Sequence, residues 1–327
     1  MKNHRENSDY RRVFLHADDL GMNCGVTDGI MHGFRQGLLT SASLLSNAPD
    51  AQRALRLWKE LLEDQAAARL PLHGWRARLE DPLSSFDLGV HLNLTQGRPL
   101  TGKDYPGELL DQSGRFPGVF ALFARLKRHG VRLCGRIQTE LARQVEFLLD
   151  HGVQPTHLNG HQYIELLPVV ADFVPQLMSR YDIRVVRVAD ERSLLRSALV
   201  QSHSPLAWIL ARLKQIFARR FHRRMEQLDV HYPAELHGTA HAGRIDMPLM
   251  RLFLGSSGGE PAGPVEIVLH PAMQADADQA DDSADGWSDP LADDRPNELR
   301  LLTSGELAEF LEAHHYRLGR LARLAAA

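Results

Sequence analysis

Residues 16–25 read HADDLGMNCG and place two carboxylates, Asp18 and Asp19, side by side. The apolar run at 13–15 directly before them is typical of a short buried strand, so the chain leaves that strand through two adjacent acids. Two like charges repel each other and are costly to desolvate unless a cation or a proton compensates them. The pair is therefore either a solvated turn with Asp at helix-capping positions or one side of a metal site.

Three histidines bear on the choice. His91 lies in FDLGVHLNLT at 86–95, whose alternation puts it on the polar face of a strand, although such a histidine alone is more often structural than a ligand. His157 and His161 lie in PTHLNGHQ, which its proline and glycine mark as extended. Because four extended residues rise about 13 Å, both cannot bind one ion without a turn. We choose His161, nearer the strand end, and expect His157 to be structural or to support a ligand.

One carboxylate and two imidazoles, with positions left open for water, suit a catalytic Zn²⁺, Mn²⁺, Fe²⁺ or Mg²⁺ ion. The neighbouring Asp could then accept a proton from water as general base. Successive side chains on a strand point apart, which favours different roles for Asp18 and Asp19. Their spacing alone does not say which of them binds the ion.

Two further residues could take part in binding or catalysis. His270 ends the apolar run at 265–270 and precedes a proline, so it could be the general acid that protonates a leaving amine, or it could simply bond to backbone. Arg187, in IRVVRVADE, could bind an anionic or carbonyl group, or could pair with Asp190. The residues alone leave both choices open.

The elements that must position these residues follow from the alternation of short apolar runs with segments of helical period. The pattern predicts strands at 13–16, 88–94, 156–161, 183–188 and 265–270, and helices near 26–37, 137–150, 168–180, 206–226 and 305–314. This order is typical of an α/β fold with a largely parallel sheet, open or closed into a barrel. Catalytic residues of such folds gather at the carboxyl ends of the strands. The candidates at or near such ends are Asp18, Asp19, His91, His161 and His270.

The bulk composition sets limits on the class of protein. At 327 residues with 43% hydrophobic residues, the chain can bury a sizeable core, and we treat residues 1–327 as one domain. A net charge of −3 gives no whole-chain argument for nucleic-acid binding. Two cysteines fit a reducing compartment, the N-terminus lacks the apolar core of a signal peptide, and no run of 18 apolar residues exists. We expect a cytoplasmic, globular protein.

Two segments differ from the rest in composition. Residues 274–298 carry eight aspartates among small residues and predict a flexible acidic loop. Residues 206–225 carry six Lys or Arg beside Leu, Ile, Trp and Phe, which predicts a basic amphipathic helix. The helix could pack on the core with a solvated basic face, which we favour, or rest on an anionic membrane surface. A nucleic-acid role would depend on this helix alone, and its aromatic residues fit core contacts better.

Five segments, taken together and in order, resemble the YdjC-like carbohydrate deacetylases, the family of chitooligosaccharide deacetylase and the hopanoid-biosynthesis deacetylase. They are HADDLGMNCGVTDGI with the downstream GLLTSASLLSNAP, LGVHLNLTQGRPL, PTHLNGHQ, ELHGTAHAGRI and VEIVLHPA. They span residues 13–272, and the tail LTSGELAEFLEAHHYRLG also resembles the end of the family. Leu20 stands where the family usually has Phe, and residues 162–165 replace a histidine-rich run, which bears on the substrate.

The resemblance implies an irregular (β/α) barrel of the glycoside hydrolase/deacetylase type with one divalent ion, Mg²⁺ or Zn²⁺. It implies that metal-activated water hydrolyses an N-acetyl group from an amino sugar, with His270 assisting departure of the amine. Asn159, where family members often carry Asp, and Arg187 are expected to contact the substrate. The implied metal ligands are Asp19, His91 and His161, and the implied base is Asp18.

The basic helix, about 203–228, resembles an insertion relative to compact sugar deacetylases. We therefore hypothesise a sugar carried on a lipid or another large carrier, approached by peripheral contact of 206–225 with the inner face of a membrane. We expect no nucleic-acid partner, and a homo-oligomer is compatible with the sequence. The alternatives are a metal-dependent hydrolase of another amide or N-formyl bond, and a non-catalytic sugar-binding protein on the same scaffold.

Overall fold

Strand β1 (Arg11–Leu20) lies inside a sheet of eight strands whose recorded pairings are all parallel. The computed structural model describes residues 10–67, 79, 86–191, 205–255, 263–274 and 286–325. The strand order is β5-β4-β3-β2-β1-β7-β6, and β8 also pairs with β1. The other strands are β2 (Ser41–Leu44), β3 (Asp87–Leu92), β4 (His157–Gly160), β5 (Val185–Val186), β6 (Glu235–His237), β7 (Val265–Leu269) and β8 (Tyr316–Leu318).

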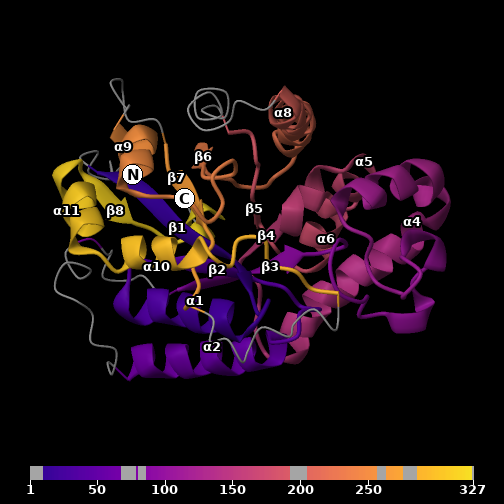
Figure 1. The fold of residues 1–327 in the computed structure, drawn as a ribbon, viewed down its shortest axis with the longest axis horizontal. Coiled ribbons are helices and arrows are strands. Elements are labelled where there is room, and N and C mark those ends of the chain that lie inside the picture. The colour runs from indigo at the N-terminus through magenta and orange to yellow at the C-terminus, as the bar shows by residue number, and fades with distance from the viewer. Residues whose placement is uncertain are drawn as a thin grey trace, which may run out of the picture.

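The sheet curls so that its two edges approach each other. An isolated parallel bridge joins Val185, on edge strand β5, to His231, just before the opposite edge strand β6. Helices surround the resulting half-barrel: α1 and α2 run along one side, α4 to α6 extend from the β4–β5 edge, and α8 lies over the top of the view (Figure 1). The predicted irregular (β/α) barrel is therefore confirmed.

The helices of the described residues follow the strands in the alternating order that the sequence predicts. Asn23 begins α1 by accepting a hydrogen bond from the backbone amide of Val26 at 2.8 Å. The described helices are α1 (Cys24–Gln36), α2 (Ala51–Ala66), α4 (Val119–Asp150), α5 (Pro168–Ala171), α6 (Val174–Arg180), α8 (Pro205–Met225), α9 (Met247–Gly255), α10 (Arg295–Leu302) and α11 (Gly305–Ala313). The 3₁₀ turns are η1 (Gly102–Asp104), η2 (Gly107–Leu109), η3 (His161–Leu166) and η6 (Leu321–Ala325).

The two faces of β1 serve different cores. Val13 and Leu15 belong to the main hydrophobic core, whereas Phe14 belongs to a small separate cluster with Val185 and Leu321. Because side chains alternate along a strand, Phe14 shares its face with His16 and Asp18. The inside of the half-barrel is therefore apolar at its amino end, where η6 fills it, and polar towards the carboxyl ends of the strands.

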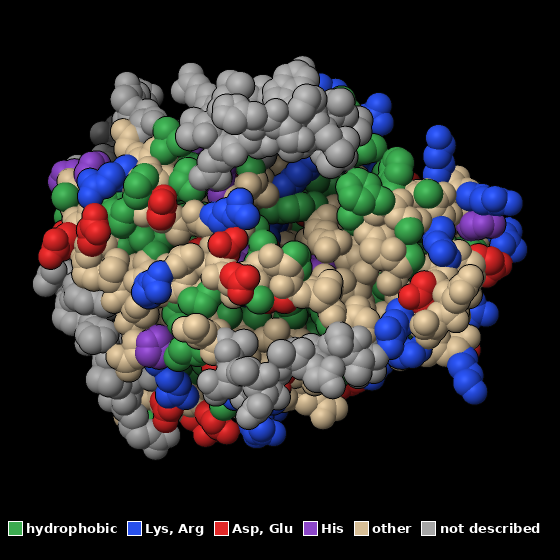
Figure 2. All heavy atoms as spheres, viewed as in Figure 1, with side chains coloured by type: hydrophobic (Ala, Val, Ile, Leu, Met, Phe, Trp, Pro, Cys, Tyr) green, Lys and Arg blue, Asp and Glu red, His purple; other side chains and the backbone are tan. Residues whose placement is uncertain are grey.

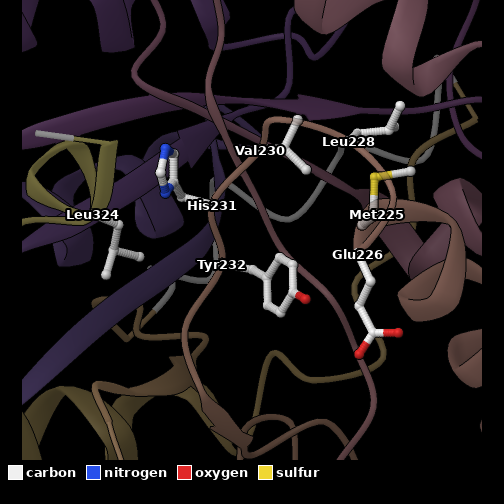
Figure 3. A pocket seen from close by; sticks show the side chains of 7 residues that line it. All are labelled: Met225, Glu226, Leu228, Val230, His231, Tyr232 and Leu324. Carbon is white, nitrogen blue, oxygen red and sulfur yellow. The ribbon is translucent and has the colours of Figure 1, made fainter. Parts of the chain in front are cut away.

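A hollow of about 230 Å³ opens at this amino end and is separate from the polar cluster. Figure 3 shows its lining side chains, which come mainly from the segment after α8, with Leu324 from η6. Leu324 packs on the cluster of Phe14, Val185 and Leu321, and nearby Arg320 binds the carboxylate of Asp87 at 2.9 Å. This end therefore closes the barrel and carries no part of the candidate site.

Several element boundaries differ from the sequence prediction. The predicted helix at 168–180 is broken into α5 and α6 around 172–173, and the helix predicted at 137–150 begins at residue 119. β2, α2, β6, α9 and α10 were not predicted; β2 has only four residues and β6 three, and α10 begins inside the segment predicted to be an acidic loop. β1 extends past the predicted 13–16 to include both Asp18 and Asp19.

The prediction of a flexible acidic loop over 274–298 is wrong for its second half. Residues 275–285 lie outside the described residues, but residues 286–298 form turns and the start of α10. Trp287 and Arg295 are buried there. The composition of the whole segment predicted disorder, but it hides the local effect of these two side chains, which are buried. A proline in the first turn of α10 also favours the start of a helix.

The predicted basic helix is confirmed as α8, and its described side chains divide between two faces. Ala218, Phe221 and Met225 are buried, so the helix packs on the core as the sequence analysis favours. The described arginines of α8 point outwards and are Arg219, Arg220, Arg223 and Arg224. Within the described part of the chain, every helix is too short or too polar to cross a bilayer.

Candidate metal centre

The end of β1 is bent so that both of its acids take part in one site. Asp19 has a left-handed backbone, with φ of 68°, and the pairing register of β1 with β2 shifts between Ala17 and Leu20. A left-handed backbone is uncommon for a residue other than glycine and persists where surrounding contacts enforce it. The bulge explains how neighbouring residues on a strand, whose side chains should point apart, both face the same cluster.

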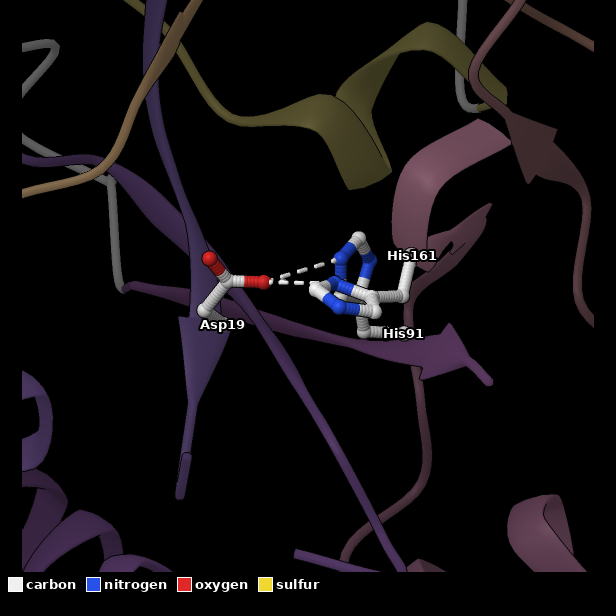
Figure 4. A group of neighbouring side chains, drawn as sticks. All are labelled: Asp19, His91 and His161. Carbon is white, nitrogen blue, oxygen red and sulfur yellow. Dashed lines mark hydrogen bonds and ion pairs between the residues drawn. The ribbon is translucent and has the colours of Figure 1, made fainter. Parts of the chain in front are cut away.

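Asp19, His91 and His161 form the centre of this cluster. Each offers one ligand atom, and these atoms lie within 4.8 Å of one another in buried surroundings. Asp19 Oδ1 lies 2.9 Å from His161 Nδ1 and 3.4 Å from His91 Nε2. Figure 4 shows the carboxylate from β1 facing both imidazoles, which come from β3 and from the turn after β4. The structure thus brings together the three residues predicted as metal ligands.

The surroundings of His91 fit a metal ligand. Its Nδ1 bonds at 2.8 Å to Asn159 Oδ1, and the Asn159 amide donates at 2.9 Å to Asp18 Oδ1. The amide oxygen can only accept, so the His91 proton sits on Nδ1 and the lone pair of Nε2 faces Asp19. Although burial lowers the pKa of His91, Asp18 and then Asp19 outweigh burial and raise it. A field that favours a proton here also favours a cation.

His161 needs a change of protonation before it can bind an ion. The backbone amide of Ser288 donates at 2.9 Å to Gln96 Oε1, which directs the Gln96 amide to donate to His161 Nε2 at 3.2 Å. In the neutral ring, Nδ1 therefore carries the proton and donates to Asp19. An ion at Nδ1 would take the place of that proton, so the neutral ring would have to carry its proton on Nε2 instead, with the Gln96 side chain turned so that its amide oxygen accepts it.

Arg295 holds the second oxygen of Asp19. Its Nη2 lies 2.8 Å from Asp19 Oδ2, and its Nε lies 2.7 Å from Asp289. Burial raises the pKa of Asp19, but His161 and then Arg295 outweigh it and hold the pKa well below its ordinary value. Asp19 therefore stays ionised and keeps Oδ1 directed at the imidazoles.

Asp18 lies beside this group in a separate charge network. Its Oδ2 binds Arg187 Nη1 at 2.6 Å, and Arg187 also binds Glu266 at 2.7 Å. Its Oδ1 lies 3.1 Å from His16 Nε2. Burial raises the pKa of Asp18, but Arg187, then His91 and His16, outweigh burial and hold it well below its usual range. A buried carboxylate kept ionised in this way can accept a proton from a neighbouring water.

His270 lies on the other side of Asp18. Its Nε2 is 3.9 Å from Asp18 Oδ2, and its buried Nδ1 has no hydrogen-bond partner among the residues that the structure describes. Burial lowers the pKa of His270 to about 4, against the pull of Asp19 and Asp18. The imidazole is therefore neutral at neutral pH, and it can donate a proton only after receiving one.

The structure corrects one predicted contact. Asp190 lies 3.3 Å from His222 and 3.9 Å from Arg219, not beside Arg187, whose guanidinium is buried between Asp18 and Glu266. The Asn159 amide is likewise engaged by His91 and Asp18, so both predicted substrate contacts already have protein partners. His157 is buried, bonded to Thr156, and packs edge-on against the His16 ring, away from the three candidate ligands.

Four residues of the cluster were missed by the sequence prediction: His16, Gln96, Glu266 and Arg295. The strand periodicity could have indicated His16, which is two residues from Asp18, and Glu266, which lies inside the predicted strand at 265–270. Gln96 lies in a connecting segment, and Arg295 is the first residue of α10, 276 positions after its partner Asp19. No local pattern marks such a pair.

Asn159 offers a test of how His91 is oriented. We expect Asn159→Leu, which removes both hydrogen bonds at similar volume, to weaken divalent-ion affinity about 10- to 100-fold. Competition with a chelator in isothermal titration measures this affinity. Thr156→Val removes a hydrogen bond from the same edge of β4 but touches none of the candidate ligands, so its affinity should match the wild type. Equal affinities for Asn159→Leu and the wild type would refute this orienting role.

Buried neutral histidines predict a loss of stability in mild acid. Burial lowers the pKa of His157 well below 6.5, lowers that of His16, and lowers that of His270 to about 4. The unfolded chain then takes up protons on these rings first as pH falls, so each ring costs stability between pH 6.5 and about 4, whereas Glu165 and Glu298, whose pKa values burial raises to about 7, act in the opposite direction. For His270 alone the loss reaches about 3 kcal/mol.

Urea denaturation at a series of pH values, with chelator present, measures this loss. His157→Gln removes one of the three titrating rings without touching the candidate ligands, so its stability should fall less across the window than that of the wild type. If the free energy of unfolding of His157→Gln falls across the window as much as that of the wild type, the prediction is wrong.

A parallel half-barrel with its polar cluster at the carboxyl ends of the strands defines the class of protein, a (β/α) barrel with a candidate metal site. A family model described as YdjC-like protein matches residues 12–313, and the chain belongs to this family. The family predicted from the five sequence segments is thereby confirmed, and with it an enzyme of a hydrolase family.

Curated relatives carry the name carbohydrate deacetylase. The protein of Geobacillus stearothermophilus is 34% identical over 181 residues, which are 55% of this chain and 61% of that protein. The protein of Vibrio cholerae is 27% identical over 303 residues, covering 93% of this chain and 92% of its own. A solved structure from Enterococcus faecalis, described as a cellobiose-phosphate cleavage protein, covers 96% of this chain with 20% identity and a TM-score of 0.64, which shows the shared fold.

Proposed function

We propose that this protein is a metal-dependent carbohydrate deacetylase that hydrolyses the N-acetyl group of an amino sugar. The observation that carries the proposal is the convergence of Asp19, His91 and His161 on one buried point with the ionised carboxylate of Asp18 beside them. The names of the curated relatives support the substrate class. The protonation pattern of His91 supports the presence of a cation.

Asp19, His91 and His161 would hold the ion. When bound, a divalent ion polarises an amide carbonyl and makes a water acidic enough to attack at neutral pH. Two of the three donors are imidazoles, which suit Zn²⁺, whereas Mg²⁺ prefers oxygen donors. We therefore propose Zn²⁺ before Mg²⁺.

Asp18 acts as general base in this proposal. Arg187 and His16 keep it ionised and fix the direction of its carboxylate, so it can accept a proton from the attacking water. The leaving amine must then receive a proton, and neutral His270, 3.9 Å from Asp18, can pass one on after receiving it. Arg187 and Asn159 become positioning residues, because their side chains are engaged by Asp18, Glu266 and His91.

Metal analysis and acetate release on the same samples test the proposal. Purified protein should contain close to one divalent ion per chain and release acetate from N-acetylglucosamine oligomers, and chelation should abolish the release until the metal is restored. Metal without acetate release directs the search to N-formyl and other amides, and so contradicts the proposed substrate. Absence of metal after incubation with Zn²⁺, Mn²⁺ or Mg²⁺ contradicts the mechanism and favours a sugar-binding protein.

We also propose that the natural sugar is carried on a lipid or another large carrier, reached at the inner face of a membrane. The basic residues of α8 support this part of the proposal, because the arginines among its described side chains, at 219, 220, 223 and 224, are exposed. Acetate release from a glycolipid should then exceed release from a free oligosaccharide at equal sugar concentration. Equal rates on both substrates would contradict the carrier.

A further inference from the structure

The amino-terminal part of α4 carries an apolar stripe on its outer face. Phe120, Phe123 and Val131 are 69%, 39% and 85% exposed. Their spacing of three and eight residues places them on one side of a helix with 3.6 residues per turn. Single exposed apolar residues are ordinary, but a stripe of large ones on one face is typical of an interaction surface.

Helix α8 continues this surface. The rings of Phe123 on α4 and Phe217 on α8 pack with centroids 6.0 Å apart, and neighbouring Ile216 is 51% exposed. Ala218 and Phe221, on the inner side of α8, are buried and fix the helix to the barrel. We call the exposed surface of the two helices the α4–α8 face, made of Phe120, Phe123, Lys127, Val131, Ile216, Arg220 and Arg223.

The charge of the α4–α8 face is of one sign. Residues 119–139 contain five Lys or Arg and no acid, and α8 contains six and no acid, in a chain whose net charge is −3. Figure 2 shows hydrophobic side chains between α8 and α4, and Lys and Arg side chains along the outer edge of α4. This concentration of positive charge complements an anionic surface.

A hollow of about 340 Å³ lies between α8 and α5, next to the apolar stripe. Its apolar lining includes Phe217 and Phe221, and three arginines of α8 line it as well. Arg224 is paired with Asp172, whereas Arg220 and Arg223 make no recorded ion pair or hydrogen bond with the described residues. An arginine pair above an apolar floor suits a phosphate headgroup attached to acyl chains.

We propose that the α4–α8 face docks on an anionic membrane surface. The exposed apolar side chains enter the boundary between headgroups and acyl chains, while Arg220, Arg223 and Lys127 bind lipid phosphates. Nucleic acid explains the charge but not the apolar stripe, which includes Val131, the most exposed of its members. A membrane surface explains both.

Docking would leave α8 between the membrane and the turn that carries His161. Lys214 of α8 places its Nζ 3.3 Å from the ring centroid of Tyr163, two residues after His161. The helix that contacts lipid therefore also contacts the turn that carries a candidate ligand. This part of the inference rests on the proposed function, because it presents a membrane-carried amino sugar to that site.

Sedimentation with vesicles tests the docking. Wild-type protein should bind phosphatidylglycerol vesicles and bind phosphatidylcholine vesicles weakly, with salt weakening the former. Reversing two charges in Arg220→Glu/Arg223→Glu should lower the affinity for phosphatidylglycerol about 20-fold or more. Phe120→Ser/Val131→Ser should lower it about tenfold. The matched control, Arg56→Glu/Lys59→Glu, makes the same charge change at exposed positions of α2 and should bind like the wild type.

Each outcome decides one part of the inference. No binding of the wild type to phosphatidylglycerol, or equal losses in Arg220→Glu/Arg223→Glu and in the α2 control, overturns the α4–α8 face. Vesicle binding needs no catalysis, so a failed deacetylase assay leaves this result standing. Where acetate release from soluble oligosaccharide is measurable, Arg220→Glu/Arg223→Glu should retain it and lose release from a glycolipid in vesicles. Loss of both would overturn the presentation of a membrane-carried sugar.

Discussion

Asp19→Asn protein should fold, bind divalent ions about 1000-fold more weakly than the wild type, and release almost no acetate. The substitution removes the charge of the carboxylate that faces His91 and His161 and keeps its volume. Arg295 keeps its second partner, Asp289, so the change leaves no buried charge without a counter-ion. Calorimetric titration with Zn²⁺ and elemental analysis of the purified variant measure the loss.

Asp87→Asn is the matched control for that result. Asp87 is also a buried strand aspartate, but it binds Arg320 at the amino end of the barrel. Its replacement should lower the melting temperature and leave metal content per folded chain unchanged. If Asp19→Asn retains stoichiometric metal, or if both variants lose it equally, the assignment of Asp19 as a ligand fails.

Asp18→Asn should separate metal binding from catalysis. We expect this variant to retain its metal while its kcat falls about 10²- to 10⁴-fold. The amide cannot accept the proton of the attacking water. Its oxygen can still accept the hydrogen bond of Asn159, which orients His91, so the candidate ligands should keep their positions. KM should change little, because the contacts of Asp18 are to Arg187, His16 and Asn159 within the protein. Steady-state acetate release and metal content of the same sample measure both quantities.

Glu266→Gln separates loss of the base from disturbance of its surroundings. It removes one carboxylate from Arg187 but leaves the bond of Arg187 to Asp18, so kcat should fall less than in Asp18→Asn. Comparable kcat values for Asp18→Asn and the wild type would exclude Asp18 as the base. Loss of metal in Asp18→Asn would instead make it a ligand.

The parts of the site that were predictable are those marked by a strand end. Asp19, His91 and His161 each follow or end an apolar stretch, and parallel strands bring such ends together. Their separate roles were not predictable from spacing, because the left-handed backbone of Asp19 decides which carboxylate faces the imidazoles. The rise of an extended chain predicted that His161 and His157 do not share one site, and the structure places His161, not His157, beside Asp19 and His91.

The parts that were not predictable depend on contacts far apart in sequence. Arg295 lies in a segment whose aspartates predicted solvation, and only the folded sheet places it against Asp19. Gln96 is oriented by the backbone amide of Ser288, a residue of the same segment. The exposed stripe of α4 was missed for a different reason, since its apolar residues resemble those of a core-facing helix until the burial of each is known.

The place of β1 in the sheet has a consequence for synthesis on the ribosome. This strand pairs with β7 and β8, which are synthesised much later than β1. Its Asp19 binds Arg295, which is also synthesised late. Until these segments have emerged, the nascent chain therefore holds an apolar strand with an unpaired edge, and Asp19 without the counter-ion Arg295. Such a chain folds late and slowly, because segments that are far apart in the sequence must meet before the sheet is complete. We expect co-translational chaperones to engage it throughout elongation, and ions to bind only after release.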